Sequence, residues 1–135
     1  MEGDTIGKNY LTVIAILAVI FLIMGGLLLA VIVNTHLSQP DVFGRIDFIP
    51  APTIPADDPQ VRHLTEQDFL LHPGLNLILT GEDPPLTARI VRDMKKPGNP
   101  QPAIAEDEGF SLYFAYRGGY VEWNGTVYLV DGWVT

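Results

Sequence analysis

Cysteine is absent from the 135-residue chain, and charged side chains are absent from residues 11–33. The first absence excludes disulfide bonds, a thiolate zinc site and a cysteine nucleophile. The second determines the architecture, because Thr12 is the only polar side chain in that stretch. A helix over these residues would be roughly 34 Å long, enough to cross a hydrocarbon core of about 30 Å. We therefore expect residues 11–33 to form a transmembrane helix in the lipid bilayer.

Basic residues are few. The chain has 8 Lys and Arg against 16 Asp and Glu, and residues 34–135 alone have 7 against 14. Nucleic-acid binding depends on clustered Lys and Arg that displace counterions, and an anionic lipid surface attracts the same side chains. The composition therefore argues against a nucleic-acid partner, and against a C-terminal part that lies on anionic lipid.

The head, residues 1–10, lacks the basic region of a cleavable signal peptide, and no small-residue cleavage pattern follows the long apolar stretch. We therefore expect an uncleaved, single-pass anchor in the cell membrane. Lys8 lies closer to the apolar stretch than Arg45 does on the other side. The positive-inside rule then places the head inside and the C-terminal domain in the extracytoplasmic space.

Gly25 and Gly26 lie near the middle of the apolar stretch, and Gly26 with Ala30 makes one small-xxx-small step. Small side chains let a second helix approach closely. Two interpretations stay open. Gly25 and Gly26 belong either to a helix-packing face for another membrane protein or to an ordinary lipid-facing anchor.

Proline is absent before residue 40 and after residue 102, and four of the eleven prolines fall within residues 50–59. Proline-dense segments form extended, semi-rigid spacers. Residues 34–60 are therefore predicted to be a stalk, within which residues 42–49 would form a short strand or lie against the domain.

Residues 61–135 have the signals of a small α+β domain. A capping-box pattern at Thr65 and Asp68 predicts a helix that ends before the Pro73-Gly74 pair. Asp83 with two following prolines predicts a second short helix through residues 86–96. Four of the seven basic residues after the anchor fall there and would form a solvated face or bind an anionic partner: Arg89, Arg92, Lys95 and Lys96.

The remaining residues are expected to form strands. Residues 110–117 alternate in polarity, which is typical of a strand with one buried face. Asn124-Gly125 between two apolar runs predicts a type I′ hairpin with Trp123 opposite Thr126. The prediction is thus a three-stranded antiparallel meander packed against two short helices, preceded by one transmembrane helix.

No residues form a recognisable catalytic, cofactor-binding or metal-ligating set. His63 and His72 are nine residues apart, which does not place them on one helical face as ligands. The acidic run at residues 106–108 is expected in a loop and lacks the staggered spacing of a calcium site. We therefore expect no enzymatic activity, no cofactor and no metal, and identify no small-molecule substrate. A tethered hydrolase would need a pocket that gathers His63 or His72 with carboxylates.

Asn124-Gly125-Thr126 is also an N-x-T sequon. Asn124 is therefore a candidate glycosylation site if the domain lies outside the membrane, although the turn alone accounts for the Asn-Gly pair.

Two segments resemble known proteins. Residues 64–69, LTEQDF, with Pro73 and Leu75 resemble an LTxxDF…PxL helix, and residues 120–130, YVEWNGTVYLV, resemble a C-terminal NGT hairpin. Together they resemble small uncharacterised membrane-anchored proteins of archaea. The long proline-containing stretch between the two segments departs from that pattern. The resemblance implies a small tethered domain and carries no activity or site residues.

These observations lead to one function hypothesis and one alternative. The first is a single-pass, membrane-anchored accessory or interaction protein that displays a small acidic domain. The alternative is a small structural subunit of a larger membrane protein complex, held to a partner helix through Gly25 and Gly26.

Overall fold

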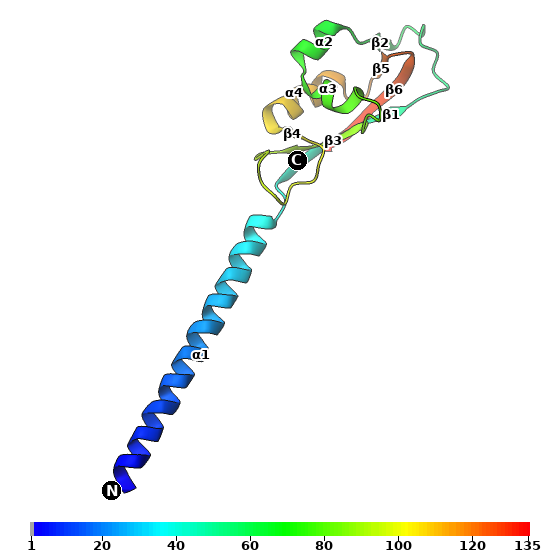
Figure 1. The fold of residues 1–135 in the computed structure, drawn as a ribbon. Coiled ribbons are helices and arrows are strands. Elements are labelled where there is room, and N and C mark those ends of the chain that lie inside the picture. Colours follow the sequence, from blue (N-terminus) through cyan, green and yellow to red (C-terminus); the bar gives the residue numbers. More distant parts are fainter. Residues whose placement is uncertain (1) are drawn as a thin grey trace. The chain divides into compact units, whose positions relative to one another are not determined.

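The computed structural model describes the backbone of residues 2–135 and the side chains of residues 6–135. It consists of two units, the N-terminal helix as far as Ser38 and a compact unit over Gln39–Thr135 (Figure 1). Each unit is described by itself below.

The first unit is the helix α1, Glu2–Ser38. Its Ile6–Ser38 part is long and apolar enough to span a membrane, with a mean hydropathy of 3.2 over an 18-residue window. Polar residues begin at Asn34, yet the helix continues to Ser38. Pro40 ends it, because proline disfavours the helical conformation of the residue before it.

The second unit is a six-stranded sheet covered on one face by three helices. The strand order is β2-β5-β6-β1-β3-β4, with β2–β5 and β3–β4 parallel and the other pairs antiparallel. The strands are β1 Val42–Pro50, β2 Val61–His63, β3 Thr87–Val91, β4 Ala103–Ala105, β5 Tyr120–Trp123 and β6 Thr126–Val134. The helices are α2 Glu66–Leu71, α3 Gly74–Leu79 and α4 Glu106–Tyr116. The α+β class is confirmed, and the three-stranded meander is wrong.

The largest difference from the sequence prediction is β1. This strand comes from the segment assigned to the stalk, yet it pairs with β6 on one side and β3 on the other. Gly44, Ile46 and Phe48 face the core on alternate positions, and both Ile46 and Phe48 are almost completely buried. The short strand, one of the two alternatives for residues 42–49, is therefore present, and its alternating apolar side chains complete the centre of the sheet.

The predicted second helix is also wrong. Residues 81–86 form a loop, and residues 87–91 form β3. Two successive prolines at 84 and 85 remove two backbone donors, and the β-branched residues that follow favour a strand. Leu86, Ile90 and Met94 are spaced four residues apart, as on one face of a helix, but this spacing does not indicate a helix here.

The predicted strand at residues 110–117 is instead the longest helix of the domain, α4. Its buried residues are Gly109, Leu112, Tyr113 and Tyr116, which have the i, i+3, i+4, i+7 spacing of one helical face. The acidic residues 106–108 form its first turn, where negative charge is favourable. The expectation that this acidic run lies in a loop is therefore wrong as well.

Two local predictions are confirmed. The capping box at Thr65 and Asp68 opens α2. The β5–β6 hairpin has the predicted register, with Trp123 paired to Thr126, and its turn residues Asn124 and Gly125 have positive φ values of 52° and 82°.

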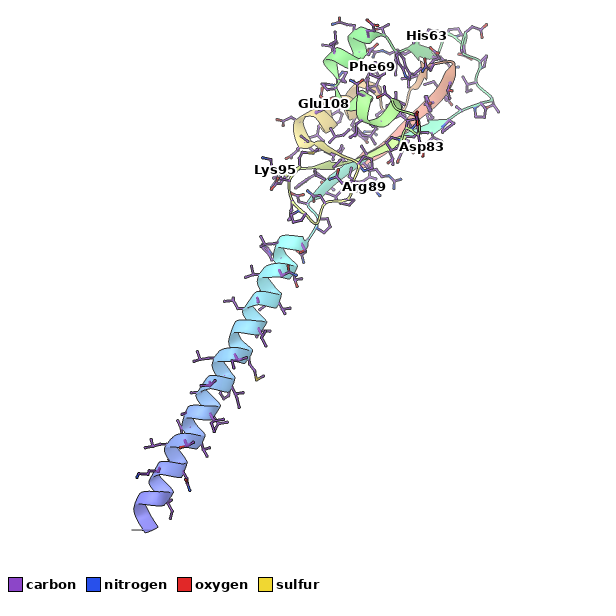
Figure 2. The ribbon with its side chains drawn as sticks, in the orientation of Figure 1. His63, Phe69, Asp83, Arg89, Lys95 and Glu108 are labelled. Atoms are coloured by element: carbon purple, nitrogen blue, oxygen red, sulfur yellow. The ribbon has the colours of Figure 1, made fainter. Side chains whose placement is uncertain are left out.

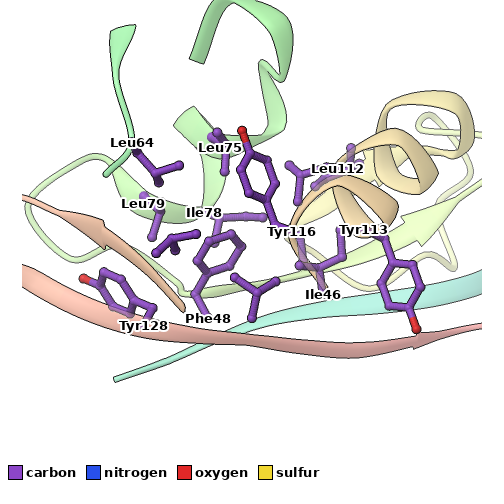
Figure 3. Close-up of a cluster of buried hydrophobic side chains, with 14 of the residues drawn as sticks. Ile46, Phe48, Leu64, Leu75, Ile78, Leu79, Leu112, Tyr113, Tyr116 and Tyr128 are labelled. Atoms are coloured by element: carbon purple, nitrogen blue, oxygen red, sulfur yellow. The ribbon is translucent and has the colours of Figure 1, made fainter. Parts of the chain in front are cut away.

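The core lies between the helices and one face of the sheet (Figure 3). Strands β1 and β6 approach so closely at Gly132, whose φ is +148°, that a Cβ atom there would lie 2.0 Å from the carbonyl oxygen of Arg45. Helix α4 approaches β3 in the same way, since a Cβ atom on Gly109 would lie 2.7 Å from side-chain atoms of Ile90. These two glycines fix the spacing of the core elements.

Candidate functional site

Helix α2 has a buried carboxylate on its inner side. Asp68 Oδ1 accepts hydrogen bonds from Arg62 Nη2 at 2.6 Å and from the Tyr116 hydroxyl at 2.8 Å. Its Oδ2 accepts the Thr65 backbone N–H at 2.9 Å and the Thr65 hydroxyl at 3.1 Å. One carboxylate therefore connects β2, the start of α2 and the end of α4.

The bonds around Asp68 change two pKa values. Burial by itself raises the pKa of Asp68, but the bonds from Thr65 and Tyr116 and the charge of Arg62 outweigh it, so the pKa lies below its usual value. Burial and the bond to Asp68 raise the pKa of Tyr116 to about 12. Near neutral pH, the ionised carboxylate of Asp68 therefore faces the neutral phenol of Tyr116.

Aromatic contacts extend this network. The Arg62 guanidinium lies 4.7 Å from the centre of the Tyr116 ring, and the His72 ring meets the Tyr116 ring edge-on at a centroid distance of 5.4 Å. The Nδ1 atom of His72 is buried and has no hydrogen-bond partner among the described residues. His72 therefore acts here as a packed aromatic ring at the C-terminal end of α2.

The outer side of α2 lines a shallow groove of about 370 Å³. Phe69 and Trp123 form its floor with ring centroids 4.5 Å apart, and Phe69 is marked on α2 in Figure 2. The other lining residues are Glu66, Leu70, Asn76 and Thr80. The groove therefore has an aromatic floor, and an amide, a hydroxyl and a carboxylate lie at its rim.

Large apolar side chains stand exposed around this helical layer. Leu70 is 76% exposed and Leu71 is 62% exposed on α2, and Phe114 is 68% exposed on α4. The bonds of Asp68 hold α2 so that these leucines face solvent while Phe69 enters the core. Of these three side chains, Leu70 also lines the groove beside Phe69 and Trp123.

The sequence-predicted sites lie elsewhere. Asn124 is exposed at the tip of the β5–β6 hairpin, where the Gly125 N–H donates to Glu122 at 2.8 Å. Gly25 and Gly26 lie in α1, with nothing within 4 Å of the Cβ position of either. The structure thus shows Asn124 to be accessible and the two glycines to be open on this single chain.

The histidines do not meet in one site. His63 pairs with Glu122 at 2.9 Å on the sheet face opposite the helices, whereas His72 packs on Tyr116. His36 lies in the last turn of α1. Among residues 6–135 no three His, Asp or Glu side chains gather in a geometry that would hold a metal ion. His63 therefore does lie beside a carboxylate, but it is exposed and shares no site with His72.

Sequence reasoning missed the groove, because it depends on contacts between distant elements. Trp123 reaches Phe69 only because β5 lies beside β2, and β2 leads into α2. One local signal was available. Leu70 and Leu71 follow Phe69 directly, and three successive apolar residues cannot all face the core from one short helix.

Comparison of the chain with known protein families, with curated proteins and with solved structures finds no match.

Proposed function

We propose that this chain is a single-pass membrane protein whose acidic C-terminal domain binds a partner protein through the groove beside α2. The length and hydropathy of α1 support the anchor, as does the resemblance to membrane-anchored archaeal proteins. The domain then serves as an interaction module at the membrane surface. The positive-inside comparison of Lys8 and Arg45 favours an extracytoplasmic position for it.

The observation that carries the proposal is the exposure of Leu70 in the lining of the groove, with the exposed Leu71 next to it in the chain. The centre of the domain is well packed, with Ile46, Leu75 and Ile78 at 0% exposure, and Leu70 at 76% is the most exposed large apolar side chain of the domain. A leucine side chain that stays in water forgoes roughly 1.5–3 kcal/mol of burial free energy. Two adjacent leucines at a groove with an aromatic floor are therefore typical of a surface that a partner covers.

The groove also indicates the chemistry of the partner. Glu66 stands at its rim, and the domain as a whole has 14 acidic against 7 basic residues. Like charges across an interface are costly, and opposite charges increase the association rate. The partner segment should therefore offer an apolar side chain for the Phe69–Trp123 floor, flanked by Lys or Arg.

The test is purification of the full chain from its native membrane in mild detergent. Wild-type protein should retain a stoichiometric partner, and Leu70→Glu should reduce its recovery at least tenfold. Thr53→Glu adds the same charge at an exposed loop position and should leave recovery unchanged. A wild-type protein that purifies alone, or equal recovery with both variants, would contradict the proposal.

Orientation has its own test. Protease added to intact cells should cleave the domain if it lies outside. In an organism that N-glycosylates, a glycan on Asn124 would then add mass that Asn124→Gln removes. A domain that is protected until the membrane is permeabilised would reverse the orientation and leave the groove proposal standing.

A further inference from the structure

The loop between β3 and β4 carries the domain's main concentration of positive charge. Lys95 is exposed, Lys96 is half-buried and Met94 between Asp93 and Lys95 is 44% exposed. Arg92, at the start of the loop, is already engaged. It pairs with Glu106 at 3.4 Å and its guanidinium lies 4.4 Å from the centre of the Phe43 ring. Figure 2 shows Lys95 on this loop.

Hydrogen bonds fix the loop to Asp41. The Asn99 side chain, 7% exposed, accepts the Asp41 backbone N–H at 2.9 Å and donates to the Asp93 carbonyl oxygen at 2.6 Å. The Asp93 N–H in turn donates to the Asp41 carboxylate at 3.3 Å, and the Asp93 carboxylate accepts the Lys95 N–H at 2.9 Å. These hydrogen bonds therefore hold the loop that carries both lysines against Asp41, the residue through which the chain enters the domain.

That residue is close to α1 in the chain. Only Gln39 and Pro40 separate Ser38, the last helical residue, from Asp41. An extended residue spans at most about 3.6 Å. Covalent connection alone therefore keeps the lysine loop near the C-terminal end of the apolar helix, whatever orientation the domain takes.

We propose that Lys95 and Lys96 bind anionic lipid headgroups, with Met94 entering the interface between headgroups and acyl chains. The inference rests on the proposed membrane anchor. Two lysines attract an anionic surface only weakly, too weakly to hold a free domain there. A tethered domain meets the surface at millimolar effective concentration, so weak contacts suffice to orient it.

The charge of the rest of the domain supports one orientation. Asp41 and Asp93 lie beside the lysines and keep their charge while they accept loop N–H groups, so only the longer lysine side chains can reach past them to a lipid surface. The overall excess of acidic residues predicts that the domain as a whole is repelled by anionic lipid. Attraction at the lysine loop and repulsion elsewhere together turn this loop toward the membrane and keep the groove beside α2 accessible. The acidic composition thus selects the side of the domain that contacts lipid.

The absence of cysteine provides the probe. The full chain carrying Met94→Cys, labelled with an environment-sensitive fluorophore, is placed in nanodiscs of phosphatidylcholine alone or with phosphatidylglycerol added. We expect the quenching constant for acrylamide to fall at least twofold when the anionic lipid is present. High salt should reverse this change, because ions screen the attraction. The same label at Thr53→Cys is the control and should show no difference.

Charge reversal completes the test. Lys95→Glu with Lys96→Glu should abolish the lipid-dependent change, and the neutral pair Lys95→Gln with Lys96→Gln should halve it or more. Quenching that is equal in both lipids, or unchanged by charge reversal, would overturn the lipid contact while leaving the anchor intact. A chain that does not elute with the nanodiscs would overturn the anchor, and the lipid contact with it.

Discussion

Helix α2 reverses the arrangement of most surface helices, because it buries a charged side chain and exposes an apolar one. Its inner side places Asp68 in the interior, where each carboxylate oxygen accepts two hydrogen bonds, and its outer side leaves Leu70 76% exposed. A buried charge is retained only when its partners replace the water it loses. The inner side therefore serves to position the helix, and the outer side serves to present apolar surface. The predictions below test this division, starting with the framework on which both sides depend.

Gly132→Ala should have the largest effect. A Cβ atom at this position would lie 2.0 Å from the Arg45 carbonyl oxygen, and the positive φ adds strain. Since the clash is with backbone in the central β1–β6 pair, no side-chain rotation relieves it. We expect a loss of at least about 4 kcal/mol in the free energy of unfolding. Gly119→Ala is the control, because its Cβ atom would lie 3.4 Å from the nearest atom. Urea titration should show no folded protein or a greatly reduced midpoint for the first variant only.

Asp68→Asn should cost about 2–3 kcal/mol, because a neutral amide replaces the carboxylate that accepts hydrogen bonds from Arg62 and Tyr116. Asp57→Asn, at an exposed loop position, should cost nothing measurable. The loss should depend on pH. Since the folded pKa of Asp68 lies below the usual value of about 3.9, its stabilisation is complete above that pH and disappears as pH falls through the folded pKa. The stability difference between wild type and variant should therefore shrink in acid, and a constant difference would contradict the network.

Tyr116→Phe should cost about 1–2 kcal/mol, since it removes one hydrogen bond to a charged group and keeps the ring that packs against Arg62 and His72. Tyr116 has a folded pKa of about 12, above the value of about 10 expected when unfolded. Its stabilisation is thus complete below pH 10 and is lost as pH rises toward 12. Wild type should lose more stability than the variant over that interval, as followed by circular dichroism.

These sites show which parts of the fold the sequence predicts. The capping box at Thr65 and the Asn124-Gly125 hairpin are local, so neighbouring residues suffice to specify them. Helix α4 is different, because residues 109–116 fit both a period of two and a period of 3.6. Phe114 distinguishes the two patterns, since a strand would bury it and the helix leaves it 68% exposed. The acidic residues 106–108 were the available signal for a helix start.

The place of strand β1 in the sheet and the groove could not be predicted by the same means. The alternation in residues 42–50 is visible in the sequence, but neighbouring prolines favoured a stalk. Only pairing with β3 and β6, both distant along the chain, identifies β1 as the centre of the sheet. The Phe69–Trp123 contact likewise joins residues 54 positions apart. Non-local contacts of this kind leave no periodic signal within either segment.

Leu70→Glu should have the smallest effect on stability and the most specific effect on binding. Its side chain is already in water, so the change should alter the free energy of unfolding by less than about 0.5 kcal/mol. Binding of the proposed partner should nevertheless be lost, because a carboxylate replaces the apolar side chain that the partner would cover. Gly26→Leu in α1 tests the alternative function, in which a partner helix packs against α1 within the membrane. If the chain is a subunit held through that helix, Gly26→Leu should release the partner and Leu70→Glu should not. If the domain is the binding module, the two results should be reversed. The measurement is the amount of partner recovered with each variant, and the unfolding midpoints should stay unchanged. The result shows whether the apolar side of α2 binds a partner or has no function.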